Sequence, residues 1–136
     1  MTDAPSGLPP GVRRGTETVL LVEDDAGVRQ AGMRLLQRLG YTVLAAPDGE
    51  EALRCYREHA AEIALVITDI DLPKLDGWQL RAEVRKTGAA GGAVRFLFVS
   101  GEPINQTNDR DGATSFLAKP WTLPELATRV REVLDR

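Results

Sequence analysis

The stretch Ile63-Ala-Leu-Val-Ile-Thr-Asp69 joins a short apolar run to a terminal carboxylate, and a loop containing Pro73 follows it. An apolar run of this length predicts a buried strand, so we expect Asp69 at the mouth of that strand, exposed and rigidly held. An earlier run, Thr18-Val-Leu-Leu-Val22, ends in the same way, in Glu23-Asp24-Asp25. If the two strands lie side by side, their acids meet in one pocket, which repels itself unless a divalent cation fills it. The pattern points to metal-assisted phosphoryl chemistry.

The composition is that of one ordinary soluble domain. The chain has 136 residues, of which 43% are hydrophobic and 27% charged, and its net charge of −3 argues against nonspecific binding to nucleic acid. The apolar runs are far shorter than the ~20 residues that span a membrane. Cys55 is the only cysteine, which excludes an internal disulfide and fits a reducing compartment. We therefore expect a cytoplasmic protein with neither nucleic acid nor membrane among its partners.

The first 16 residues differ in composition from the rest. The stretch from Met1 to Gly11 is rich in Pro and Gly and lacks the basic and apolar regions of a secretory signal. Residues 1–16 are therefore predicted to be a flexible leader or linker, and residues 17–136 to form the folded domain.

Apolar runs alternate with helical patterns along this domain. Strands are predicted at residues 19–22, 42–46, 63–68, 94–99 and 115–118. Helices are predicted at about residues 26–39, 50–60, 77–87 and 122–135, the first of them capped by Asp25. Residues 101–112 contain one large apolar residue, Ile104, and several turn formers, so we expect a short or irregular fourth helix there, of a turn or two at most.

This alternation predicts an α/β fold with a parallel sheet and helices on both faces. Right-handed crossovers leave few topologies, and we expect the flavodoxin-like, doubly wound, five-stranded sheet with strand order 2-1-3-4-5. Ligands bind such sheets outside the carboxyl ends of the strands, at the switch point between strands one and three. Those are the two strands that end in Glu23-Asp24 and in Asp69.

With these positions in place, the chain resembles the receiver domain of two-component response regulators over about residues 17–135. Four pieces carry the resemblance, and each is weak alone but specific in this order on these strands. They are Val19-Leu-Leu-Val-Glu-Asp-Asp25, Val66-Ile-Thr-Asp-Ile-Asp-Leu-Pro73 with Asp76-Gly77, Phe98-Val-Ser-Gly101, and Phe116-Leu-Ala-Lys-Pro120.

The resemblance implies a phosphoryl acceptor and a metal site. Asp69 would attack a phosphohistidine on a histidine kinase or a histidine phosphotransfer protein and form an acyl phosphate. Asp24 and Asp69 would bind Mg²⁺ (or Mn²⁺), Glu23 would act partly through bound water, and the backbone carbonyl of Asp71 would be a further ligand. The domain would switch a protein-interaction surface for a downstream target, as a signalling domain and not as a turnover enzyme.

The resemblance also implies helper, switch and tuning residues. Lys119 and the hydroxyl of Ser100 would contact the phosphoryl oxygens. Ser100 would then move toward the phosphoryl group and leave space for the aromatic ring at position 116, which is Phe116 here where the family often has Tyr. Asp71 and Glu102 occupy the two positions that flank the phosphoryl group, so we hypothesise that their charges alter the lifetime of the acyl phosphate.

Two other functions stay open at this point. A receiver fold can act as a docking module without being phosphorylated. The sequence Asp69-Ile-Asp71 also resembles the Asp-x-Asp motif of haloacid-dehalogenase-type phosphatases, although Pro73 and the place of the motif on strand three depart from that pattern. The leader resembles the linker ahead of receivers in hybrid histidine kinases, and a stand-alone regulator is the other expectation.

Overall fold

The computed structural model describes residues 14–87, 94–101, 114–118 and 121–135. Within these ranges five parallel strands form one sheet in the order β2-β1-β3-β4-β5. The strands are β1 (Thr18–Val22), β2 (Thr42–Ala46), β3 (Ile63–Asp69), β4 (Arg95–Ser100) and β5 (Thr114–Ala118). The helices are α1 (Ala26–Arg38), α2 (Gly49–His59), α3 (Gly77–Arg85) and α5 (Leu123–Leu134). The predicted flavodoxin-like topology is confirmed.

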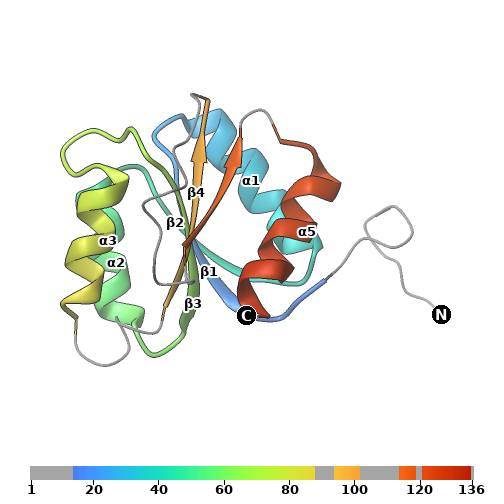
Figure 1. Cartoon of the computed structure of the whole chain (residues 1–136), viewed down its shortest axis with the longest axis horizontal. Helices are drawn as coiled ribbons and strands as arrows, with labels where there is room; N and C mark the ends of the chain where they lie inside the picture. Colours follow the sequence, from blue (N-terminus) through green and yellow to red (C-terminus); the bar gives the residue numbers. More distant parts are fainter. Residues whose placement is uncertain (1–13, 88–93, 102–113, 119–120, 136) are drawn as a thin grey trace.

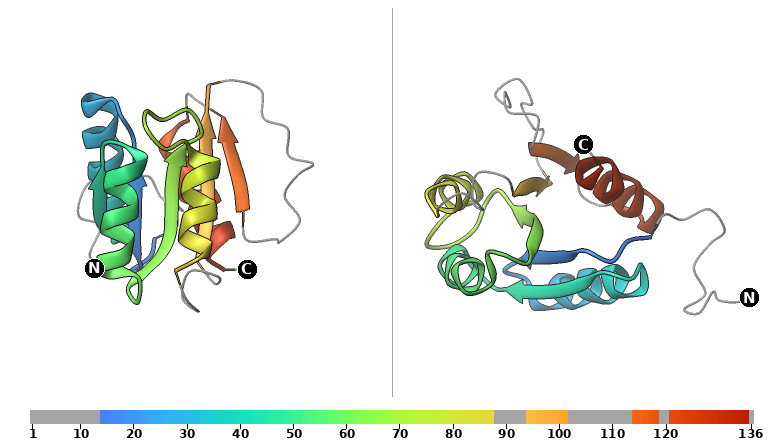
Figure 2. Two further views of the ribbon diagram at one scale, coloured as in Figure 1. Left: turned by 90° about the vertical axis from the view of Figure 1, so that its left-hand side faces the viewer. Right: turned by 90° about the horizontal axis from the view of Figure 1, so that it is seen from below.

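The sheet lies between two helical layers, with α2 and α3 on one face and α1 and α5 on the other (Figure 1 and Figure 2). Successive side chains of a strand point to opposite faces, so each strand serves both layers. In β1, Val19 and Leu21 join the core under α1 and α5, whereas Leu20 and Val22 join the core under α2 and α3. Burial on both faces explains why the strands read as continuous apolar runs.

Each described helix begins at a side chain that caps its free N–H groups. Asp25, Asp48, Asp76 and Thr122 are the N-caps of α1, α2, α3 and α5, and each accepts a hydrogen bond from a backbone N–H of the first turn. The predicted capping role of Asp25 is confirmed. Because α1, α2 and α3 each start shortly after a strand ends, their positive N-termini gather at the carboxyl edge of the sheet.

Some predictions fall on residues that the structure does not describe. Beyond Gly101, the proposed short helix at residues 101–112 lies outside the described residues, and so does most of the proposed leader. Among the helices of the described ranges, none has the length and apolarity needed to cross a bilayer.

The first residue of α2 packs directly on the loop that follows β3. A Cβ atom at Gly49 would overlap the backbone carbonyl oxygen of Leu75 and approach the Leu75 Cβ to 2.6 Å. This close approach of two backbones fixes the loop between β3 and α3 against the start of α2.

We therefore expect Gly49→Ala to lower the free energy of unfolding by about 1–3 kcal/mol, the usual cost of overpacking a rigid contact. Gly27→Ala is the matched control, because it also lies in the first turn of a helix but its added Cβ would have its nearest neighbour at 3.4 Å. The control gains helix propensity and should be neutral or stabilising. Urea denaturation measures both, and equal stability of the two variants would contradict the packing described.

Candidate functional site

Three acids from two strands converge at the carboxyl edge of the sheet. Val22, the last residue of β1, pairs with Thr68 of β3, so the residues that follow, Glu23 and Asp69, come to the same edge side by side. One carboxylate oxygen from each of Glu23, Asp24 and Asp69 lies within 4.8 Å of the others. The convergence expected from the two strand ends is therefore present in the fold.

The three carboxylates differ in exposure. Glu23 is 5% exposed and Asp69 8%, whereas Asp24 is exposed. Asp69 was expected to be exposed, and this expectation is wrong, because Asp69 is the last residue of β3 itself and still pairs with Val99 of β4 inside the sheet. An acid held in this way keeps one orientation, which suits a reactive or ligating group.

Neighbouring groups hold the acids in place. The Glu23 side chain accepts a hydrogen bond from the backbone N–H of Asp25 at 3.1 Å. Arg29 of α1 donates to the Glu23 backbone carbonyl at 2.8 Å, which brings a cation beside the cluster. On the other strand, the buried hydroxyl of Thr68 donates to the carbonyl oxygen of Asp69 at 2.9 Å. The backbone on both sides of the cluster is therefore fixed by side-chain hydrogen bonds.

The cluster fits a hard divalent cation. Two unit charges within 4.8 Å of each other, as the carboxylates of this cluster can be, repel by at least about 3.5 kcal/mol at an effective dielectric constant of about 20. A divalent cation removes this repulsion, and Mg²⁺ prefers a few carboxylate oxygens completed by water and phosphate oxygens. A small cavity of about 20 Å³ beside the acids, lined also by Val28 and Trp121, has room for about one water molecule.

The loop between β3 and α3 is unusually constrained. Lys74 has a φ angle of 70°, the left-handed region that non-glycine residues rarely adopt, and the N–H of Leu75 donates to the Pro73 carbonyl at 2.7 Å across it. The Lys74 ammonium lies 3.6 Å from Asp48 and 3.9 Å from Glu50 at the start of α2. The tight turn is thus tied to α2 by charge as well as by the Gly49 contact.

The surroundings of Asp48 favour its charged form, which faces Lys74. Its pKa is lowered, first by the hydrogen bond from the Glu51 backbone N–H and further by the Lys74 ammonium, against the opposing effect of burial. The carboxylate therefore stays charged while it caps α2 and faces Lys74. Composition and spacing do not indicate that Lys74 or Asp48 supports the loop after β3. For Thr68 the sequence does hold a signal, because it is a polar residue inside an apolar run.

The structure describes only some of the other predicted site residues. Ser100 is 8% exposed and ends β4 directly after Val99, which pairs with Asp69. Asp71 is exposed in the loop two residues after Asp69, and its predicted ligand role stays a prediction. Lys119 and Glu102 lie outside the described residues.

Phe116 is packed inward on β5. It is 4% exposed, with its ring centroid 5.8 Å from that of Phe98 and 6.1 Å from that of Trp78. The Trp78 and Phe98 rings lie 4.4 Å apart, so the three rings form one cluster between α3 and the sheet. The ring of Phe116 is held by packing alone, as its lack of a hydroxyl requires. Its predicted movement stays a prediction.

Comparisons with a family model and with curated proteins indicate the same family. The family model for the response regulator receiver domain matches residues 19–131. The sensor kinase CckA of Brucella abortus (strain 2308) is 42% identical over 125 residues, which cover 90% of this chain and 13% of that protein. For the other curated relatives compared, this chain spans about half of the relative's length.

Solved structures agree in fold. The receiver domain of the hybrid histidine kinase CckA superposes with a TM-score of 0.74 at 38% identity, over 86% of this chain and 98% of that chain. The receiver domain of the sensor histidine kinase PA1611 from Pseudomonas aeruginosa PAO1 gives a TM-score of 0.75 at 26% identity, over 90% and 100%. That receiver was crystallised with a magnesium ion coordinated in its active site cleft.

The left-handed backbone conformation of Lys74 can be tested with two variants that both remove the lysine charge. Asn tolerates a positive φ, whereas a β-branched side chain does not, so Lys74→Val should be less stable than Lys74→Asn by about 1–2 kcal/mol. Chemical denaturation measures the difference. If both variants unfold at the same denaturant concentration, the strained conformation does not exist in solution.

The acid cluster predicts stabilisation by Mg²⁺. A ligand that binds only the native state at 100 times its Kd adds about 2.7 kcal/mol, so Mg²⁺ should raise the melting temperature. Asp24→Asn should blunt this rise, whereas Asp25→Asn should keep it, because Asp25 lies outside the cluster and Asn caps a helix equally well. Equal Mg²⁺-induced shifts in both variants would rule out the site.

Proposed function

The chain belongs to the family of response regulator receiver domains of two-component systems, and on that premise we propose that Asp69 is its phosphoryl acceptor. The donor is a phosphohistidine on a histidine kinase or a histidine phosphotransfer protein. One observation carries the proposal. The carboxylates of Glu23, Asp24 and Asp69 lie within 4.8 Å of one another at the switch point of the sheet, where doubly wound folds bind their ligands.

The proposed reaction is a simple displacement at phosphorus. An oxygen of the Asp69 carboxylate attacks the phosphorus atom, the phosphorus–nitrogen bond of the phosphohistidine breaks, and the electron pair returns to the imidazole, which takes up a proton. The acyl phosphate formed on Asp69 later reacts with water, which releases inorganic phosphate and restores the carboxylate. Each chain therefore acts as a switch that is set and reset, and not as a turnover enzyme.

The main barrier is the approach of one anion to another. Glu23, Asp24 and Asp69 would hold Mg²⁺, with Mn²⁺ as a substitute and the backbone carbonyl of Asp71 as a further ligand. When bound, the cation neutralises charge on the phosphoryl oxygens. The fixed backbone around Glu23 and Asp69 keeps the acids in place, so little reorganisation is needed when the phosphoryl group arrives.

The response to phosphorylation involves neighbouring strands. We assign to Ser100 and Lys119 the recognition of the phosphoryl oxygens, which adds one hydroxyl and one compact cation to the site. Burial of Ser100 at the end of β4 supports its part in this assignment. Phe116 is the packing element that responds when Ser100 moves, and Asp71 and Glu102 tune the lifetime of the acyl phosphate.

The partners follow from the same reaction. A histidine kinase or phosphotransfer protein supplies the phosphoryl group, and a downstream protein recognises the phosphorylated surface, in the cytoplasm. The similarity to CckA supports an origin in a hybrid histidine kinase. A receiver that docks without phosphorylation and a phosphatase that uses Asp69 are the alternatives, and the following experiment separates all three.

Incubation with acetyl phosphate and Mg²⁺ should add the mass of one phosphoryl group to the intact protein, because acetyl phosphate can replace the phosphohistidine donor. Asp69→Asn should abolish the gain, and Asp76→Asn should keep it, since Asp76 caps α3 and Asn caps equally well.

No mass gain in the parent would favour the docking module, and a gain that persists in Asp69→Asn would refute the assignment of the acceptor. Continuous hydrolysis of a chromogenic phosphate ester would favour the phosphatase.

A further inference from the structure

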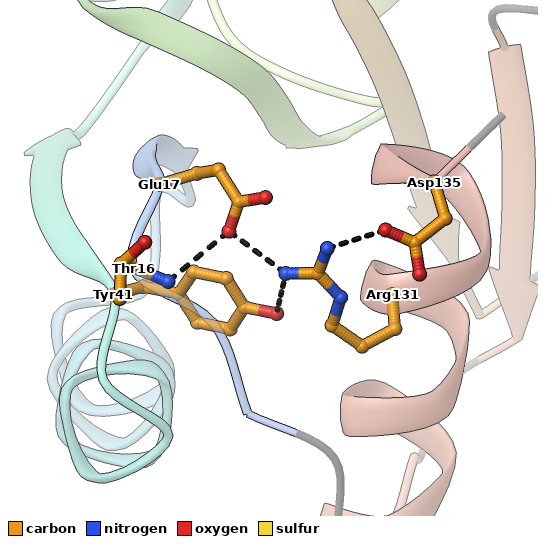
Figure 3. A network of polar contacts seen from close by, with 5 residues as sticks. All are labelled: Thr16, Glu17, Tyr41, Arg131 and Asp135. Atoms are coloured by element: carbon orange, nitrogen blue, oxygen red, sulfur yellow. Dashed lines mark hydrogen bonds and ion pairs between the residues drawn. The ribbon is translucent and has the colours of Figure 1, made fainter.

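A cluster of polar side chains at the amino edge of the sheet joins both ends of the described fold. Arg131, in the last turns of α5, donates through Nη1 to Glu17 Oε1 at 2.8 Å and to the Tyr41 hydroxyl at 3.4 Å. Its Nη2 donates to Asp135 (Figure 3). Glu17 directly precedes β1, and Tyr41 directly precedes β2. The contact from Arg131 to Glu17 therefore bridges 114 positions of the sequence.

The ion pair between Arg131 and Glu17 is less exposed to solvent than an ordinary surface ion pair. The Arg131 side chain is 13% exposed and the Glu17 side chain 31%, so solvent screens their attraction only in part. The hydrogen bond from Arg131 lowers the pKa of Glu17, while burial opposes it and raises the pKa of Tyr41. Near neutral pH the cluster thus combines a carboxylate, a neutral phenol and a guanidinium.

The backbone ahead of β1 is seated on the same cluster. The N–H of Gly15 donates to the Leu39 carbonyl at 3.0 Å, and the Glu17 carbonyl accepts from the N–H of Thr42 at 3.1 Å. A Cβ at position 15 would overlap both the Tyr41 ring and the Arg131 guanidinium. Residues 14–17, called here the lead-in segment, therefore lie between the start of β2 and the end of α5.

Helix α5 also contacts β5, the strand that carries the proposed switch residue Phe116. Arg129, two positions before Arg131, donates through Nη1 to the backbone carbonyl of Phe116 on β5. Helix α5 thus contacts β5 through one arginine and the lead-in segment through the other. Both contacts therefore depend on the position of α5.

We propose that Glu17, Tyr41 and Arg131 form a clasp that couples the lead-in segment to α5 and, through Arg129, to the backbone of Phe116. A segment of the same polypeptide joined ahead of residue 14 would then be coupled to the phosphorylation state of the domain. The first coupling rests on the contacts alone, whereas the second rests on the proposed function. The curated relatives are longer than this chain, so receivers of this kind do occur joined to other segments.

Hydrogen exchange measured by mass spectrometry tests the clasp without metal or phosphoryl group. Glu17→Gln keeps the shape but removes the charge, and it should speed exchange in the last turns of α5 at least about fivefold, the lower range of a coupling between distant sites. Arg131→Gln should speed exchange in residues 15–22, and the double variant should exceed neither single variant by much.

Glu62→Gln, which removes an exposed acid paired with His59, is the control and should change neither region. Two results would overturn the clasp. One is a change in exchange rate that Glu17→Gln causes only in its own segment. The other is a double variant whose change in exchange rate equals the product of the changes in the two single variants.

Beryllofluoride with Mg²⁺, an acyl-phosphate mimic, tests the link to the site. Its binding should change exchange in residues 14–17, and Glu17→Gln should change its Kd, because coupling between two sites acts in both directions. An unchanged Kd in Glu17→Gln would overturn the link to Phe116 and the site. Beryllofluoride that binds no better to the parent than to Asp69→Asn would overturn the proposed function instead, while the metal-free exchange result would still decide the clasp.

Discussion

The parallel pairing of β1 with β3 is the constraint on which the rest of the structure depends. Because Val22 pairs with Thr68, the chain cannot place Glu23 and Asp69 anywhere except side by side at the carboxyl edge. Their mutual repulsion opposes folding, and two apolar cores on the faces of the sheet outweigh it. The N-termini of α1, α2 and α3 gather at the same edge and reduce the cost further. The fold thus carries a site that is stable enough to form and still favours a cation.

Rigidity around this site comes from contacts that differ in kind. Thr68 and Arg29 fix backbone carbonyls by hydrogen bonds, Gly49 allows two backbones to meet, and Lys74 adopts a strained turn that is tied to α2 by charge. Strain of this kind persists only where surrounding structure determines it. At the opposite edge, Arg131 joins the two ends of the described fold. The acid cluster and the clasp therefore lie at the two ends of the same strands.

Local patterns in the sequence were sufficient for the fold and for the main acids. Apolar runs ending in Glu23-Asp24 and in Asp69 predict both strands and the shared edge, and Asp25 before an amphipathic stretch predicts a helix cap. The low exposure of Asp69 was missed, since it depends on tertiary packing around the end of β3. The turn at Lys74 and the bond from Arg131 to Glu17 were also missed, because tertiary contacts decide them and no short-range pattern records them.

The function proposed for this protein requires Glu23, Asp24 and Asp69 to bind one divalent cation together at the switch point of the sheet. Paramagnetic Mn²⁺ added to ¹⁵N-labelled protein tests it most directly, because it broadens the amide signals of residues close to the bound ion. Substoichiometric Mn²⁺ should first broaden the signals of residues 23–25 and 68–71, and excess Mg²⁺ should restore them. Broadening centred on another acidic region, such as residues 58–62 at the end of α2, with residues 23–25 and 68–71 unaffected, would show that the three acids do not form a cation site.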